Sequence, residues 1–252
     1  MIPHHSVDGP PQAEAVVFSN SLGTTMDMWK PQVEAFKDRF RLIRYDTRGH
    51  GHTRIGKPGF DIDDLAEDIA DLLNHLKIER AHLVGVSLGG ATAAAFAARH
   101  PDRTARLALL CTAATIATPA YWADREEHVH TAGLAWLAEG AMDRWFTDRF
   151  RIDHPETAER FRHDFAHCDP KGYASCCRAL AKMDLHDRLP AIAAPTLAAY
   201  GELDEITTAA DAAALQAVIP DCRTAEIKGA KHLAATEKAA MVNALLLEHL
   251  EN

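Results

Sequence analysis

Residues 85–89 read Gly-Val-Ser-Leu-Gly and could provide a nucleophilic serine. The apolar run at residues 82–85 predicts a buried strand, and the alanine-rich run at residues 91–99 predicts a helix. In a G-x-S-x-G segment, a sharp turn between strand and helix raises the serine above the carboxyl edge of a sheet. We therefore predict that Ser87 is the nucleophile of a hydrolase.

A serine hydroxyl attacks a carbonyl well only when a base removes its proton, so a histidine and a carboxylate should accompany Ser87. For this kind of turn the expected chain order is serine, acid, histidine. Asp204 follows an apolar run at residues 196–200, and His232 lies in a short loop before the last helical pattern. We predict Asp204 as the acid and His232 as the base, with Glu202 as the alternative acid.

The attacked carbonyl oxygen gains negative charge, which backbone N–H groups can stabilise. One of these groups should belong to Leu88, directly after the serine. The other should lie in the loop at residues 19–23, after the first apolar run; we favour Leu22, because Gly23 gives the turn its freedom. The predicted oxyanion hole therefore consists of Leu22 and Leu88.

The pattern along the chain is typical of an α/β fold. Short apolar runs predict strands at residues 15–18, 42–45, 82–85, 107–110, 196–200 and 224–227. Helical spacing or composition predicts helices at residues 62–76, 91–99 and 237–250. Strands that alternate with helices indicate a mostly parallel sheet with helices on both faces.

Residues 118–185 depart from this alternation, because they show helical patterns and no convincing strand. They also contain Trp122, Trp136 and Trp145. We interpret them as an inserted helical cap, or lid, whose aromatic side chains line an apolar cavity over the sheet. The alternative is a set of extra helices that cover a sheet edge and form their own small core. The predicted domains are a core of residues 1–117 and 186–252 and a cap of residues 118–185.

Composition restricts the class of partner. The 252 residues include 36 acidic and 27 basic side chains, a net charge of -9 that argues against a nucleic-acid surface. No run has the length of a membrane span, and the first residues lack the apolar stretch of a signal peptide. Five cysteines, two of them adjacent, argue against a disulfide framework. We expect a cytoplasmic protein that acts on a small molecule.

A metal site is not predicted. His163 and His167 have the spacing of two ligands on one helix face, but the residues between them are Asp-Phe-Ala and lack the glutamate of an H-E-x-x-H site. Serine-based hydrolysis needs no cofactor. We therefore predict neither metal nor cofactor.

Over nearly its whole length the chain resembles the α/β-hydrolase superfamily, and within it the 3-oxoadipate enol-lactonases of aromatic-compound catabolism. The narrower resemblance rests on residues 19–24, 28–29, 44–51, 144–147, 172–177 and 183–185. It implies the α/β-hydrolase fold, with Ser87, Asp204 and His232 at the triad positions and Leu22 and Leu88 at the oxyanion positions. It also implies an enzyme that opens a carboxylate-bearing enol-lactone through an acyl-enzyme, with 3-oxoadipate as the product.

A substrate carboxylate in an apolar pocket needs a cation or hydrogen-bond donors. The predicted cap offers Arg125, His130, Arg144 and Arg149, with Trp145 as the aromatic residue nearest the substrate. His130 stands where the resembled family often carries an arginine, and Arg125 is the alternative cation.

Two alternative functions stay open. One is another cap-domain hydrolase: a carboxylesterase, a C–C hydrolase or a perhydrolase. The other is a non-catalytic ligand receptor on the same fold.

Overall fold

A twisted β-sheet forms the centre of the computed structural model, which describes residues 1–57 and 59–252. Seven strands in this part of the chain follow the order β1-β3-β2-β4-β5-β6-β7, and every pair except β1 with β3 is parallel. Their bounds are β1 His5–Asp8, β2 Ala15–Ser19, β3 Arg41–Tyr45, β4 Ala81–Val86, β5 Thr104–Leu110, β6 Thr196–Gly201 and β7 Cys222–Ile227. Strands β2 and β4 are buried along their whole length, as expected for parallel strands covered on both faces.

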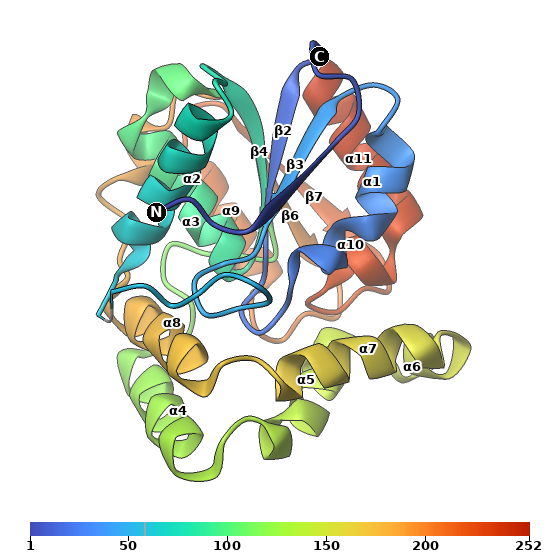
Figure 1. Cartoon of the computed structure of the whole chain (residues 1–252). Helices are drawn as coiled ribbons and strands as arrows, with labels where there is room; N and C mark the ends of the chain where they lie inside the picture. Colours follow the sequence, from blue (N-terminus) through green and yellow to red (C-terminus); the bar gives the residue numbers. More distant parts are fainter. Residues whose placement is uncertain (58) are drawn as a thin grey trace.

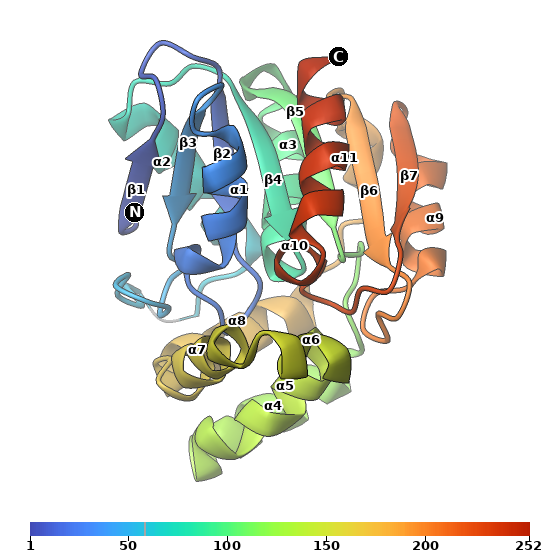
Figure 2. The ribbon, with the colours of Figure 1, turned by 90° about the vertical axis from the view of Figure 1, so that its right-hand side faces the viewer.

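Helices cover both faces of the sheet (Figures 1 and 2). One face carries α1 Lys30–Phe36, α10 Ala234–Glu237 and α11 Ala239–Glu251, and the other carries α2 Ile62–His75, α3 Leu88–Arg99 and α9 Ala209–Val218. Short 3-10 helices are η1 Met26–Trp29, η2 Pro101–Arg103 and η4 Leu189–Ala191. The small side chains of α3 let this helix lie close to β4 and β5, which places its first turn beside the end of β4.

A layer of helices crosses the end of the sheet at which β4 leads into Ser87 (Figures 1 and 2). Its elements are α4 Pro119–Ala132, η3 Ala135–Leu137, α5 Ala138–Trp145, α6 Asp148–Asp153, α7 Pro155–Ala166 and α8 Pro170–Lys182. All of them lie between β5 and β6 in the chain, and α4 packs against α8. We call residues 118–185 the cap; that they form a domain separate from the core stays our proposal.

The predicted fold class is confirmed, but several elements were not predicted, among them helices α1 and α9. Strand β1 was not among the predicted strands, because its four residues are mostly half-buried and contain no apolar run. The predicted last helix, α11, begins two residues later than expected, because the backbone of Lys238 leaves the helical region at φ -122° and ψ 47° and separates α11 from α10. Apolar periodicity did not reveal this break. None of the helices in the described residues is long and apolar enough to cross a membrane.

Candidate active site

Ser87 occupies a strained turn between β4 and α3. Its φ of 56° lies in the left-handed region that residues other than glycine rarely adopt. The Ser87 N–H donates to Leu110 O at 3.0 Å, and the Thr112 hydroxyl donates to Ser87 O at 2.8 Å, so the last residue of β5 and the second residue after it hold the turn in place. A side chain at Gly89 would meet the backbone of Ser19, which explains the glycine two residues after the serine. This geometry is the one expected of a nucleophile at a sheet edge.

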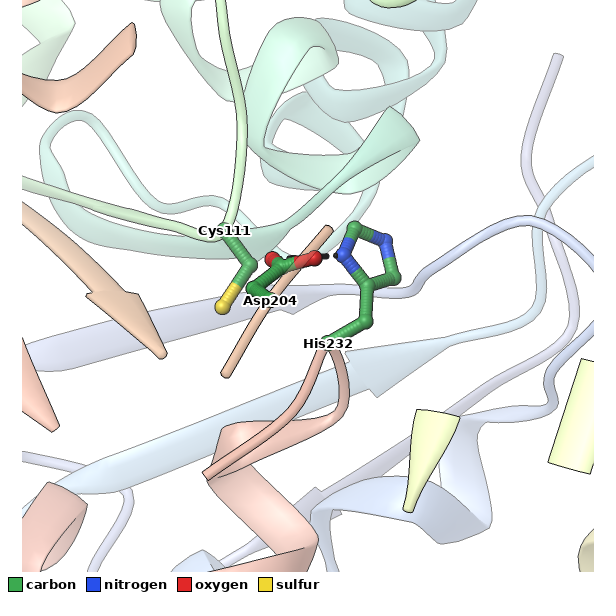
Figure 3. A group of neighbouring side chains, drawn as sticks. All are labelled: Cys111, Asp204 and His232. Atoms are coloured by element: carbon green, nitrogen blue, oxygen red, sulfur yellow. Dashed lines mark hydrogen bonds and ion pairs between the residues drawn. The ribbon is translucent and has the colours of Figure 1, made fainter. Parts of the chain in front are cut away.

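Asp204 and His232 form a buried hydrogen-bonded pair (Figure 3). The distance from His232 Nδ1 to Asp204 Oδ2 is 2.8 Å. Because an ionised carboxylate only accepts hydrogen bonds, the proton of a neutral imidazole must lie on Nδ1. The lone pair of His232 Nε2 is then available to accept a proton from a serine hydroxyl.

Three further donors converge on the Asp204 carboxylate. Ile206 N and Thr207 N donate to Oδ1 at 2.8 and 3.3 Å, and the Thr207 hydroxyl donates to Oδ2 at 2.8 Å. Burial by itself raises the pKa of Asp204, but the attraction of His232 and these hydrogen bonds outweigh it and hold the pKa below its ordinary value. Asp204 is therefore ionised at neutral pH and can orient the imidazole.

Glu202, the alternative acid, lies elsewhere. Its side chain is exposed, and Oε2 accepts a hydrogen bond from Gly229 N at 2.8 Å. The structure thus brings Asp204, and not Glu202, to His232. We retain Asp204 as the predicted acid.

Cys111 lies on the side of Asp204 away from His232 (Figure 3). One potential metal-ligand atom from each of Cys111, Asp204 and His232 lies within 4.8 Å of the other two. Burial raises the pKa of the Cys111 thiol well above its usual range, and Asp204 adds to this effect. A metal ion would need the thiolate and the Nδ1 position that already holds a proton for Asp204. These three side chains are therefore better suited to a hydrogen-bonded carboxylate–imidazole pair next to a neutral thiol than to a metal site.

The predicted oxyanion loop after β2 contacts a distant segment of the core and a residue of the cap. The Gly23 N–H donates to His50 Nε2 at 3.0 Å, and His50 Nδ1 lies 3.1 Å from Arg48 O. Burial lowers the pKa of His50, so the imidazole is neutral and can accept at Nε2 while it donates at Nδ1. Gly23 has a φ of 80°, and a side chain there would meet the Phe165 ring of the cap. These contacts hold Leu22, the predicted donor, between core and cap.

A cavity of about 400 Å³ lies between the core and the cap. Core residues that line it include Ser21, Leu22, Ser87, Glu205, Ile206 and His232. Cap residues that line it include Tyr121, Trp122, Arg125, Arg144, Trp145, Phe165 and Tyr173. The cavity thus brings Ser87 and His232 together with three of the predicted substrate-binding residues.

Arg125 is one of two half-buried arginines that line this cavity, the other being Arg144. Its Nη1 donates to the Tyr173 hydroxyl at 3.1 Å and its Nη2 to the Tyr121 hydroxyl at 2.7 Å. Burial raises the pKa of Tyr173, so this phenol stays neutral. The guanidinium therefore has neutral partners here and keeps its positive charge available to a ligand.

The other predicted substrate-binding residues are distributed differently. Trp145 is buried with its ring edge-on to Phe161 and Phe165, so it packs within the cap and also lines the cavity. His130 is exposed, with Nε2 3.5 Å from Glu126 Oε1, and does not line the cavity. Arg149 is exposed and pairs with Asp153 at 2.6 Å. We therefore keep Arg125, Arg144 and Trp145 as candidates and leave His130 out of the proposal below.

Comparison with known proteins identifies the family. Residues 14–239 match the protein family described as "alpha/beta hydrolase fold". The chain belongs to this α/β-hydrolase family. The predicted superfamily is thereby confirmed.

Two curated α/β-hydrolases and one solved structure are similar over most of the chain. The proteins named "3-oxoadipate enol-lactonase 1" and "3-oxoadipate enol-lactonase 2" of Acinetobacter baylyi are 39% and 38% identical; the alignments cover 92% and 95% of this chain and 86% and 90% of theirs. The crystal structure of the enol-lactonase from Burkholderia xenovorans LB400 is 39% identical, with a TM-score of 0.96, and the match covers 99% of this chain and 96% of that one. The predicted resemblance to enol-lactonases is confirmed.

Several residues that contact the site of this α/β-hydrolase were not predicted from sequence. Thr207 follows Asp204 by three residues, a spacing at which an aspartate often caps a turn, so this contact had a local signal. His50 belongs to an Arg-Gly-His-Gly run, but nothing local indicates that its ring reaches Gly23. Tyr173 lies in a segment that carried the resemblance, without a predicted role.

His50 offers a test of the oxyanion loop. Replacing it in His50→Phe removes the acceptor of the Gly23 N–H and frees the loop that carries Leu22. We expect kcat for ester hydrolysis to fall about tenfold to a hundredfold, somewhat less than the loss of an oxyanion donor itself. His50→Gln, whose amide oxygen can accept the same hydrogen bond, should lose less activity. Equal losses in both variants, with folding intact by circular dichroism, would argue against this role.

Proposed function

We propose that this α/β-hydrolase opens a carboxylate-bearing enol-lactone, with conversion of 3-oxoadipate enol-lactone to 3-oxoadipate as its reaction. The observation that carries the proposal is the half-buried Arg125, which faces the same cavity as Ser87 and His232 and has neutral phenols as partners. A lactone that bears a carboxylate matches this combination of a nucleophile and a half-buried cation. The similarity to two enol-lactonases over most of the chain supports the same substrate class.

In the first half of the proposed reaction, Ser87 Oγ attacks the lactone carbonyl carbon while His232 Nε2 takes the hydroxyl proton. The carbonyl oxygen becomes an oxyanion, which the N–H groups of Leu22 and Leu88 stabilise. The intermediate then collapses, and the bond between the carbonyl carbon and the ring oxygen breaks. The ring oxygen takes the proton from His232 and leaves as an enol that is still attached through the acyl chain. Its conversion to the ketone makes ring opening hard to reverse.

In the second half, water hydrolyses the acyl-enzyme. Neutral His232 takes a proton from the water as its oxygen attacks the acyl carbon, and the same oxyanion donors stabilise the new intermediate. Collapse breaks the bond to Ser87 Oγ, which recovers its proton from His232. Throughout, the Asp204 carboxylate keeps the imidazole oriented and stabilises its protonated form.

The charges around the cavity suit a substrate with one carboxylate at its far end. Arg125 and Arg144 lie on the cap side, whereas the exposed Glu205 lies on the core side, next to Asp204. Attraction to the cap and repulsion from Glu205 would turn the carboxylate away from the reacting carbonyl. Trp145 and Trp122 supply apolar surface for the carbon chain between the two ends.

Arg125→Gln tests this assignment of the cation. We expect kcat/KM for the enol-lactone to fall about tenfold to a hundredfold through a higher KM, because a hydrogen-bonded charge pair is lost. The kcat/KM for an uncharged aryl acetate should change little. The matched control is Arg149→Gln, which removes an exposed arginine of the same cap. Equal effects of Arg125→Gln on both substrates would show that Arg125 does not recognise the carboxylate.

A spectrophotometric comparison of substrates tests the proposed function itself. The wild-type chain should hydrolyse the enol-lactone with a much larger kcat/KM than 4-nitrophenyl acetate or butyrate. A large advantage for the aryl esters would overturn the substrate assignment and favour the alternative of a general carboxylesterase. A single slow turnover of either substrate, without recycling, would favour a ligand receptor.

A further inference from the structure

Glu237 is a buried acid at the boundary between core and cap that no step above uses. It is the last residue of α10, five residues after His232, and its exposed fraction is 8%. Oε2 accepts a hydrogen bond from Lys231 N at 2.7 Å. Oε1 accepts two hydrogen bonds from Thr147, one from its N–H at 2.8 Å and one from its hydroxyl at 2.5 Å. One carboxyl group thus joins the residue before His232 to the cap.

A second contact joins the same two segments. The N–H of Leu233, the residue after His232, donates to Trp145 O at 3.2 Å. Trp145 lines the cavity and precedes Thr147 by two residues. Both neighbours of His232 in the chain therefore have their N–H groups held, one by Glu237 and one by the cap.

We propose that Glu237 is a positioning residue. It fixes the loop of residues 231–233, called the His232 loop, relative to residues 145–147 of the cap, where Trp145 forms part of the cavity wall. The inference depends on the proposed function, since it takes His232 as the base of an ester hydrolysis. Glu237 itself does not contact the reacting atoms. It acts through the backbone of Lys231 and Thr147, which keeps the catalytic base and the substrate pocket in a fixed relative position.

Two physical arguments support this role. A loop residue has few constraints of its own, and a displacement of a catalytic group by about 1 Å can cost about a hundredfold in rate. The donors to Glu237 are two backbone N–H groups and a hydroxyl, all partly buried, which would lose their acceptor if the carboxyl group were removed. The segments that contain Lys231 and Thr147 would then shift toward other hydrogen-bond acceptors, and this shift would displace both His232 and Trp145.

The test uses 4-nitrophenyl acetate, which requires Ser87 and His232 but has no carboxylate for the cap to recognise. Glu237→Gln keeps the shape of the side chain but replaces one acceptor oxygen with a donor, so Lys231 N and Thr147 cannot both keep their hydrogen bonds. Thr147→Val removes the hydroxyl contact from the cap side, and Thr147→Ser restores it. Because Thr147 also caps α6 through Phe150 N, Thr118→Val is the control for loss of a helix cap. Thr118 caps α4 in the same way, through Tyr121 N.

All rates are expressed per active site, counted by titration with a phosphonate inhibitor, so misfolded protein does not contribute. We expect Glu237→Gln to lower kcat for 4-nitrophenyl acetate at least tenfold with little change in KM, because the base is displaced. For the enol-lactone, kcat should fall and KM should also rise, because Trp145 moves. Thr147→Val should lower kcat several-fold, and Thr147→Ser should recover most of the loss. Combining Glu237→Gln with Thr147→Val should add little to Glu237→Gln alone.

The proposal is wrong if Thr147→Val lowers kcat per active site no more than Thr118→Val does, or if Glu237→Gln keeps wild-type kcat. It is also wrong if the two changes multiply as independent effects. Failure of the substrate assignment gives a different result. The variants then show the expected changes with 4-nitrophenyl acetate, while the wild-type chain does not hydrolyse the enol-lactone. Absence of any ester hydrolysis by the wild type would overturn both proposals.

Discussion

We expect Ser87→Ala to reduce lactone turnover to a trace, with kcat lowered by about 10⁴- to 10⁶-fold. The alanine has no oxygen that could form the acyl-enzyme, so only binding and the oxyanion donors would remain to assist direct attack by water. The left-handed backbone at position 87 tolerates alanine as well as serine, since both carry a Cβ, and the fold should persist. The measurement is lactone consumption at saturating substrate, with circular dichroism to establish folding.

Ser175→Ala is the matched control for that variant. Ser175 is also buried, but it lies in α8 and donates to Lys171 O within its own helix. Because Ser175 does not line the cavity that holds Ser87 and His232, loss of its hydroxyl should leave kcat within about threefold of wild type. Substantial lactone turnover by Ser87→Ala would mean that the nucleophile is a different group.

The second large effect is expected for Asp204→Asn, with kcat lowered by about 10⁴-fold. An asparagine amide can donate a proton toward Nδ1, which favours the imidazole tautomer that has its hydrogen on Nε2. That tautomer cannot take the proton of Ser87, and the imidazolium formed later would lack its carboxylate. Steady-state kcat for 4-nitrophenyl acetate measures this effect without involving the cap cation.

Glu202→Gln is the control for Asp204→Asn, because it makes the same chemical change two residues earlier in the chain. Glu202 is exposed and bonds to Gly229 N, so we expect nearly unchanged kcat. The opposite outcome, an inactive Glu202→Gln with an active Asp204→Asn, would reverse the assignment of the acid.

The same aspartate should also affect stability at acid pH. Its pKa is lower in the folded chain than in the unfolded one, so the unfolded chain binds a proton first as the pH falls. The stabilisation from Asp204 is complete above its ordinary pKa of about 4 and is lost as the pH falls through the lower folded value. Urea unfolding of wild type and Asp204→Asn between neutral and acid pH should show a smaller acid dependence in the variant.

The parts of the site that could be predicted from sequence are those with a local signal. Ser87 has glycines on both sides and a strand and a helix adjoining it, so a short segment specifies its turn. Asp204 and His232 each follow a strand of a parallel sheet, and the carboxyl ends of such strands meet at one edge. Chain order, together with its place in the short loop before the last helix, then distinguished His232 from fourteen other histidines without any knowledge of contacts. The 2.8 Å pair is consistent with that reasoning, while the role of each residue stays a prediction.

The parts that could not be predicted depend on contacts between distant segments. Arg125 and His130 both lie on α4, but five residues of helix turn the two side chains about 140° apart. Only the packing of α4 against α8 decides that Arg125 meets Tyr173 and that His130 faces solvent. The contacts of His50 with Gly23 and of Glu237 with Thr147 likewise join residues 27 and 90 positions apart. Composition and periodicity contain no trace of such pairs.

The most direct test of the central claim is a crystal structure of the chain after reaction with a phosphonate that carries a terminal carboxylate. We predict a bond from phosphorus to Ser87 Oγ, with one phosphonyl oxygen about 2.7–3.1 Å from both Leu22 N and Leu88 N. His232 Nε2 should face the adduct, with its Nδ1 still bonded to Asp204. A phosphorus atom bound to another side chain, or a phosphonyl oxygen directed away from both N–H groups, would contradict the account.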